Sequence, residues 1–181
     1  IVRILEPSVG LGAFLPQLAS LFSAADQVIV DCVEIDADTI ESLKASLKHI
    51  NLGCNIVLNF HHSDFLKFEI QDKYDLVTTN PPYGKTSEKY VELTKDQHKT
   101  KNLFALFLLK LYNVANEIVC IIPKNFAIAD EFYSVRKLYE SYPIVRICDF
   151  GVKYFKKVFV EIVSIHFSAS YKGTTNVVDY I

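Results

Sequence analysis

Residues Asn80-Pro81-Pro82-Tyr83 place an amide, a rigid pair of prolines and an aromatic ring directly after the apolar run Tyr74–Thr79. Prolines neither extend a strand nor begin a helix easily here, so the motif forms an elbow at a strand end. The Asn80 side-chain oxygen and the Pro81 carbonyl oxygen can accept both N–H bonds of an exocyclic amino group, which aims the nitrogen lone pair. Tyr83 offers a flat face on which a planar substrate stacks. The motif therefore predicts chemistry on an amino nitrogen.

A second motif, EPSVGLGAF, covers Glu6 to Phe14 between an expected strand and an expected helix. Gly10 and Gly12 allow a tight turn and a close approach to a bound group, and the helix start offers N–H donors. Glycine turns also occur for structural reasons, and the third glycine of a full GxGxxG pattern is missing. The motif predicts a ligand loop that needs support from other residues.

Acidic residues at the next two strand ends give that support. Glu34 follows Gly12 by 22 residues and can accept the hydroxyl groups of a ribose. Asp64 can accept from an adenine amino group while Phe65 packs on the base. The alternatives are a solvated Glu34 and a turn role for Asp64, whereas Asp36 suits the cap of the following helix.

Together the loop and the two acids predict a pocket for an adenosine-containing cofactor. NAD and S-adenosylmethionine both fit, but NAD also needs a pyrophosphate cradle, which Phe14 and the missing glycine make less suitable. Methyl transfer to an amino nitrogen needs no general base, because the proton can leave after the nitrogen becomes cationic. We interpret His61 and His62 as surface or loop histidines, because no cluster at ligand spacing joins them, and we expect no metal.

Apolar runs alternate with helix-period stretches along the chain, which predicts an α/β fold with a parallel sheet and helices on both faces. Strands are expected at Val2–Glu6, Val28–Glu34, Asn55–Asn59, Tyr74–Thr79, Glu117–Pro123, Ile144–Phe150 and Phe159–Phe167. Helices are expected at Gly12–Phe22, Asp36–His49, Asn102–Ala115 and Asp130–Tyr142. The last connection is too short for a helical crossover, so the seventh strand should be antiparallel. This is the outline of a Rossmann-like methyltransferase fold.

Composition sets the remaining limits. The 181 residues fit one domain, 1–181, and no apolar run is long enough to span a membrane. Four widely spaced cysteines predict reduced thiols in a cytoplasmic protein. The net charge of −2 gives no overall nucleic-acid signal, so any basic face must be local. Candidates for binding DNA phosphates, or alternatively solvated surface lysines, are Lys85, Lys89, Lys95 and Lys99.

These motifs resemble the S-adenosylmethionine-dependent N6-adenine DNA methyltransferases of restriction–modification systems. The matching stretches are LEPSVGLGAFL, VEID, SDF, NPPY and YFKKVFVEIVSIHF. The resemblance implies methyl transfer from S-adenosylmethionine to a flipped-out adenine of double-stranded DNA, with Asn80, Pro81 and Tyr83 as catalytic residues. It implies stacking of the base between Tyr83 and Phe155. It also implies a cofactor site made of Glu6, Pro7, Gly10, Gly12, Glu34, Ile35, Asp64, Phe65 and Asn80.

In that family a target-recognition domain follows the last strand and a cofactor-binding segment precedes the first. We therefore expect this chain to be a catalytic fragment that relies on a further domain or subunit, alongside a cognate restriction nuclease. Rival functions are methylation of an RNA base or of a release-factor glutamine, and a catalytically silent methyltransferase-like subunit.

Overall fold

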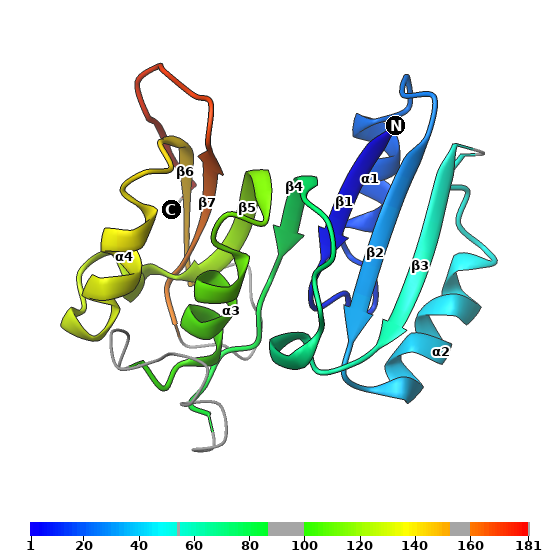
Figure 1. Ribbon diagram of the computed structural model, residues 1–181, viewed down its shortest axis with the longest axis horizontal. Coiled ribbons are helices and arrows are strands. Elements are labelled where there is room, and N and C mark those ends of the chain that lie inside the picture. The colour runs from blue at the N-terminus through cyan, green and yellow to red at the C-terminus, as the bar shows by residue number, and fades with distance from the viewer. Residues whose placement is uncertain (54, 87–99, 153–159, 181) are drawn as a thin grey trace. The chain divides into compact units, whose positions relative to one another are not determined.

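The computed structural model describes residues 1–53, 55–86, 100–152 and 160–180 (Figure 1). The chain divides into two compact units, Ile1–Thr79 and Asn80–Ile181, and each is described on its own. The expectation of one catalytic domain over the whole chain stays a prediction. In the described part of the chain, no helix is long and apolar enough to cross a membrane.

The first unit contains a parallel sheet with the strand order β3-β2-β1-β4. Its strands are β1 (Val2–Glu6), β2 (Val28–Glu34), β3 (Ile56–His62) and β4 (Tyr74–Thr79). The helical elements are α1 (Leu15–Leu21), α2 (Ala37–Leu47) and the 3-10 turn η1 (Phe65–Lys67). Runs of β-branched residues form the strands, since their side chains pack well on a pleated, buried surface.

Helix α2 begins where the sequence predicts its cap. The Asp36 carboxylate accepts from the Asp38 N–H at 3.1 Å and from the Thr39 hydroxyl at 2.8 Å. These bonds satisfy donors that a helix start otherwise leaves open. The side chains of Ile40 and Leu43 are buried on one face of α2, and α2 contacts β2 and β3. The cap and the apolar stripe together fix where this helix lies.

The second unit contains a mixed sheet with the strand order β5-β7-β6-β8. Its strands are β5 (Ala115–Pro123), β6 (Ile144–Gly151), β7 (Ile162–Ser168) and β8 (Asn176–Asp179). Its helical elements are α3 (Leu103–Leu111), η3 (Lys124–Ala127), η4 (Asp130–Phe132) and α4 (Tyr133–Tyr139). Strand β7 runs antiparallel to β5 and β6, which confirms the predicted reversal.

The predicted strand count and some predicted element boundaries were wrong. The described residues contain eight strands rather than seven, because the short and mostly exposed β8 pairs in parallel with β6. Its exposure removes the apolar pattern that reveals buried strands. Helix α3 ends at Leu111, before the predicted Ala115, since Asn113 has a φ of 64° and Ala115 already begins β5. Strand β3 continues to His62 rather than ending at Asn59.

Two ion pairs of Lys124 connect the ends of three strands of the second unit. Lys124 Nζ lies 2.6 Å from Asp149 Oδ2 and 3.8 Å from Glu161 Oε2. The Lys124 N–H also donates to the Glu161 carbonyl at 2.9 Å. The hydrogen bond raises the pKa of Lys124 and lowers the pKa of Asp149, so both groups are charged at neutral pH. Lys124 thus holds together the end of β5, the end of β6 and the residue before β7.

Candidate active site

The glycine loop after β1 has the tight backbone that its sequence predicts. Gly10 has a φ of +51° and Gly12 a φ of +76°, in the region that favours glycine. A Cβ on Gly12 would lie 2.6 Å from Leu43 Cδ1 and 3.0 Å from Leu15 Cδ1. A Cβ on Gly10 would meet nothing within 4 Å. Gly12 therefore permits close packing on the helices, whereas Gly10 borders open space.

Glu34 is fixed by backbone donors at the end of β2. Its Oε2 accepts from the Gly10 N–H at 3.0 Å, and its Oε1 accepts from the N–H groups of Ile35 at 2.8 Å and Asp36 at 3.0 Å. A carboxylate has about four lone-pair sites, so this set leaves capacity for a further donor. Glu34 thereby links the glycine loop to the β2 end, and its contact with a ribose stays a prediction.

Glu6 is the last residue of β1, directly before the same loop. Glu6 is 1% exposed, and its Oε2 accepts a hydrogen bond from the Thr78 hydroxyl at 2.8 Å. Burial raises the pKa of Glu6 well above its usual value, and the Thr78 hydrogen bond offsets only part of this effect. The neighbouring Pro7 is also buried. Glu6 is therefore a buried acid under the loop, and its contact with a cofactor stays a prediction.

Asp64 has a structural role in addition to the predicted one. Its Oδ1 accepts from the Leu66 N–H at 3.0 Å, and its carbonyl accepts from the N–H groups of Lys67 and Phe68 at 2.9 and 3.0 Å. These bonds make Asp64 the N-cap of η1. Phe65 is 2% exposed, so its ring belongs to the core in this structure. The predicted contacts of both residues with an adenine base stay predictions.

His61 and His62 both belong to β3, so a loop position for either was wrong. His62 is exposed, which agrees with a surface residue, and its Nε2 lies 3.1 Å from the Ile35 carbonyl oxygen. His61 instead binds Asp31, its Nε2 lying 2.9 Å from the Asp31 Oδ1. Asp31 did not enter the sequence prediction, although an acid in the middle of the apolar run VIVDCV was the available signal.

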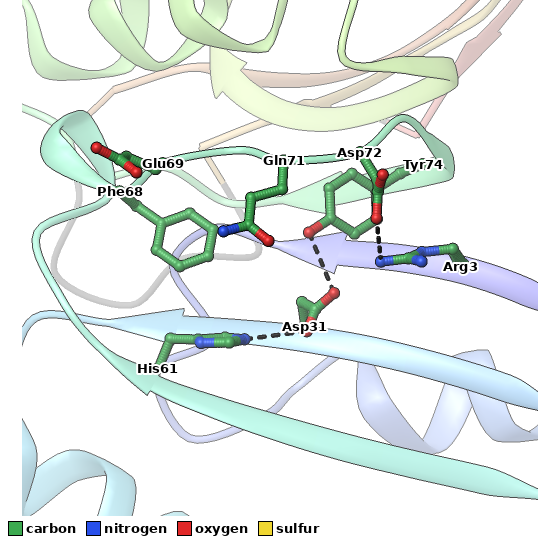
Figure 2. Close-up of a pocket in the computed structure, with 8 residues that line it drawn as sticks. All are labelled: Arg3, Asp31, His61, Phe68, Glu69, Gln71, Asp72 and Tyr74. Carbon is green, nitrogen blue, oxygen red and sulfur yellow. Dashed lines mark hydrogen bonds and ion pairs between the residues drawn. The ribbon is translucent and has the colours of Figure 1, made fainter.

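Asp31 borders a polar pocket of about 260 Å³ on one face of the first unit's sheet, and Figure 2 shows its lining. The Tyr74 hydroxyl donates to Asp31 Oδ2 at 3.1 Å, beside the His61 contact. Arg3 pairs with Asp72 at 3.2 Å, and its guanidinium lies 5.9 Å from the centre of the Tyr74 ring. Within this pocket, Asp31 therefore binds side chains of β3 and β4, and Arg3 of β1 binds Asp72.

In the second unit, the NPPY motif has an internal hydrogen bond. The Tyr83 hydroxyl donates to Asn80 Oδ1 at 3.0 Å and to the Ile121 carbonyl at 3.2 Å. Burial raises the pKa of Tyr83 to about 12, so the hydroxyl stays a neutral donor at physiological pH. The ring meets Phe104 edge to face, with 6.4 Å between centroids. The tyrosine therefore orients the asparagine oxygen on which the predicted chemistry depends.

This bond also sets a condition for the chemistry. An amino group that approaches Asn80 Oδ1 must share this oxygen with the Tyr83 hydroxyl or replace it. Pro81, the source of the second predicted acceptor, is buried, whereas Pro82 is exposed. The motif is thus held together by its own hydrogen bond, which fixes the position of the Asn80 acceptor oxygen.

Some predicted site residues lie outside the described part of the chain. These are Phe155, Lys89, Lys95 and Lys99. Lys85, which follows the NPPY motif closely, is described. Its side chain is exposed, and its backbone forms an isolated antiparallel β-bridge with Asn102. Among the residues that the structure describes, no group of three or more His, Cys, Asp or Glu is arranged to hold a metal ion.

The fold is that of a known enzyme class. A class I S-adenosylmethionine-dependent methyltransferase structure from Listeria monocytogenes superposes with a TM-score of 0.79 over 98% of this chain and 57% of that chain. The two sequences are 18% identical, so this likeness establishes the fold alone. The predicted Rossmann-like methyltransferase fold is thereby confirmed.

Sequence comparison defines the family. Residues 21–159 match the Eco57I restriction-modification methylase family, and the chain belongs to that family. The type II methyltransferase M.VspI of Vibrio sp. (strain 343) is 28% identical over 160 residues, 81% of this chain and 37% of the relative. Ribosomal RNA small subunit methyltransferase A of Mycoplasma mycoides is 33% identical over 144 residues, 74% of this chain and 49% of the relative. The chain thus spans half or less of these relatives.

Proposed function

We propose that this chain is the catalytic part of a DNA methyltransferase that methylates the N6 amino group of adenine. The observation that carries the proposal is the ordered NPPY motif, in which the neutral Tyr83 hydroxyl holds the Asn80 acceptor oxygen at 3.0 Å. Membership of a restriction-modification methylase family supports methylation of DNA. The choice of adenine rests on the acceptor chemistry of the motif, which suits an exocyclic amino group.

The residues of the first unit fit an adenosine-containing cofactor. Gly10 borders open space where any other residue would place a Cβ, and the fixed Glu34 carboxylate has capacity for a hydroxyl donor. Glu34 would bind the ribose, Asp64 the adenine amino group, and Glu6, Pro7, Ile35 and Phe65 would shape the site. S-adenosylmethionine supplies an electrophilic methyl group when bound.

In the proposed reaction, the target adenine leaves the duplex stack. Inside a base pair its amino group is already hydrogen-bonded, and extrusion costs a few kcal/mol, which stacking and backbone contacts must offset. Tyr83 and Phe155 would stack on the base, while Asn80 Oδ1 and the Pro81 carbonyl would accept its N–H bonds. These acceptors matter most as the nitrogen gains positive charge. Its proton leaves afterwards, so no side chain has to act as general base.

The expected partner is double-stranded DNA, held through Lys85, Lys89, Lys95 and Lys99. Because the chain spans 37% of M.VspI, we propose that the remainder of the complete protein, or a separate subunit, recognises the target sequence. A cognate restriction nuclease would act on the same sequence. A DNA substrate and unpaired thiols at Cys32, Cys120 and Cys148 fit a cytoplasmic location.

RNA is the second candidate substrate. The Mycoplasma mycoides relative is named as a ribosomal RNA methyltransferase, and an RNA base can present the same amino group to Asn80 and Pro81. Single-stranded RNA exposes its bases without duplex extrusion. Transfer to a release-factor glutamine, or no transfer at all by a catalytically silent subunit, would be seen in the same assay.

The test is transfer of a labelled methyl group by the complete protein to duplex DNA, ribosomal RNA or release factor. We expect label on adenine of DNA, and digestion to nucleosides identifies the position. Asn80→Ala should lower kcat by about 10²–10³-fold, as loss of one transition-state hydrogen bond does elsewhere, while cofactor affinity stays constant. Full turnover in Asn80→Ala, or label on cytosine, on RNA or on glutamine alone, would contradict the proposal.

Tyr83 should fail in a different way. Tyr83→Ala removes the stacking surface and should weaken capture of the base by about 1–3 kcal/mol, seen as higher KM and lost fluorescence of an adenine analogue on extrusion. Tyr83→Phe keeps the ring, so base capture and much of the activity should remain, and the part of kcat that is lost measures the contribution of the bond to Asn80. Equal loss of base capture in both variants would assign the effect to the hydroxyl instead of the ring.

A further inference from the structure

Asp31 lies in the middle of β2 and does not belong to the glycine loop. Its carboxylate accepts hydrogen bonds from side chains of two other strands, β3 and β4. Its Oδ1 accepts from Asn59 Nδ2 at 3.0 Å and lies 2.9 Å from His61 Nε2, while its Oδ2 accepts from the Tyr74 hydroxyl at 3.1 Å. The side chain is 10% exposed. Burial raises the pKa of Asp31, but these hydrogen bonds outweigh burial, so the pKa lies below its usual value. An ionised carboxylate is an acceptor only, which suits this set of donors.

The two ends of one connection meet at this carboxylate. His61 is the penultimate residue of β3, and Tyr74 is the first residue of β4. The residues between these strands form η1 and the coil that follows it, without a longer helix. Figure 2 shows His61 and Tyr74 both turned towards Asp31, from the two sides of the pocket. Asp31 thus holds the start and the finish of the segment that contains Asp64.

A continuous set of contacts leads from Asp31 to Asp64. The His61 ring, held by Asp31, packs against the Phe68 ring at 5.0 Å between centroids. The Phe68 N–H donates to the Asp64 carbonyl at 3.0 Å, which closes the turn that Asp64 caps. Movement of the imidazole would therefore disturb Phe68, whose backbone closes this turn, and the turn sets where the Asp64 carboxylate lies.

We propose that Asp31 is a positioning residue that, through His61 and Phe68, fixes the Asp64 turn and so sets selectivity for the adenine base of the cofactor. This inference rests on the proposed function, in which Asp64 accepts from the adenine amino group. Asp31 acts through other residues and touches neither substrate nor cofactor. Selectivity depends on it because an acceptor discriminates between an amino group and a carbonyl only when its place is fixed.

The probes are S-adenosylhomocysteine and S-inosylhomocysteine, which differ in carrying an amino group or a carbonyl oxygen on the base. Calorimetry with the complete wild-type protein should show tighter binding of the adenosyl compound, because the inosyl oxygen faces the Asp64 carboxylate. Asp31→Asn brings an amide donor against the donors of Asn59, His61 and Tyr74, and should release the turn. The preference should then fall on the order of tenfold, the effect of one hydrogen bond to a charged group.

Two further variants separate positioning from general damage. His61→Gln breaks the next contact at a side chain that is 35% exposed, and should reduce the preference while the protein stays folded. Asp72→Asn makes the same chemical change in the same pocket, but Asp72 binds Arg3 instead of His61 and Tyr74, so the preference should remain. Circular dichroism confirms that each variant is folded.

The outcomes divide clearly. A wild-type preference in both Asp31→Asn and His61→Gln overturns the positioning role, as does an equal loss in Asp72→Asn. A wild-type protein that binds both compounds equally overturns the role of Asp64 and this inference with it, but leaves methyl transfer intact. A wild-type protein that binds neither compound overturns the proposed function itself.

Discussion

At the scale of the residue, three acidic side chains of the first unit carry the same carboxyl group but have different roles, because their surroundings differ. Glu6 is buried with the Thr78 hydroxyl, and its raised pKa favours the neutral form. Glu34 accepts from backbone N–H groups and stabilises the glycine loop. Asp31 accepts from side chains of two strands and has a lowered pKa. The roles follow from the donors that surround each carboxylate.

The buried state of Glu6 predicts a pH dependence of stability. Because the folded pKa is raised, the folded chain keeps a proton that the unfolded chain releases above a pH of about 4.3. The free energy of unfolding therefore falls as the pH rises from about 4.3 to the folded pKa, by up to about 1.4 kcal/mol per pH unit. Glu6→Gln keeps an acceptor for Thr78 but cannot ionise, so this slope should disappear.

Urea unfolding between pH 4 and pH 8 measures the slope in both proteins. Glu69→Gln serves as a control, because it removes another carboxyl from the same unit without a buried site. Glu69→Gln should retain the wild-type slope. Parallel curves for wild type and Glu6→Gln would show that Glu6 is ionised in the folded chain.

At the scale of the element, the connection between β1 and α1 has two glycines with different reasons to be glycine. Gly12 needs both a positive φ and the absence of a Cβ, because Leu43 Cδ1 would lie 2.6 Å away. Gly10 needs only the positive φ, since its surroundings are open. The loop is thus packed tightly at its helix side and open at its other glycine.

This difference predicts unequal effects of alanine. Gly12→Ala combines backbone strain with overpacking and should lower the free energy of unfolding by about 2–4 kcal/mol. Gly10→Ala carries only the backbone strain and should cost about 1–2 kcal/mol. Urea unfolding of the two variants provides the comparison, each serving as the control for the other. A larger loss in Gly10→Ala would mean that the loop does not pack on α2 as described.

At the scale of the whole molecule, charge gives no general attraction to DNA, because the net charge of the chain is −2. Binding to phosphates must therefore depend on local lysines, and all four proposed ones lie between Gly84 and Lys101. Gly84 and Lys85 are held close to Leu103 and Asn102, so the two described ends of this connection lie next to each other, directly after the NPPY motif. A basic segment at this place would bring phosphates near the proposed base-binding residues.

Salt dependence tests this arrangement in the complete protein. Each phosphate contact contributes about −0.9 to the slope of log K against log salt concentration. Reversing the charge of Lys89, Lys95 and Lys99 should make the slope shallower by about 2.7 if each contacts one phosphate. Fluorescence anisotropy with labelled duplex DNA at several salt concentrations measures the slope.

The control makes the same change of charge on exposed lysines elsewhere, at Lys44, Lys48 and Lys137. Its slope should stay closer to that of the wild type. An unchanged slope in the Lys89, Lys95 and Lys99 variant would show that these lysines do not contact phosphates and are solvated surface residues.

The sequence by itself determined the main elements and the chemical motifs. The predicted bounds of β1, β2 and β4 agree with the structure, because dense apolar and β-branched runs identify buried strands without any tertiary information. The two positive-φ glycines and the Asp36 cap were also predictable, since each depends on a residue and its immediate neighbours.

Only the tertiary structure decided which side chains meet. Asp31 with His61 and Tyr74, Glu34 with the Gly10 N–H, and the Tyr83 hydroxyl with the Ile121 carbonyl all join residues far apart in the chain. Their partners are set by strand order and register, which the periodicity of one segment does not contain. The sequence did not predict β8 for a related reason. Its residues are mostly exposed and show no apolar pattern, and only its pairing with β6 makes it a strand.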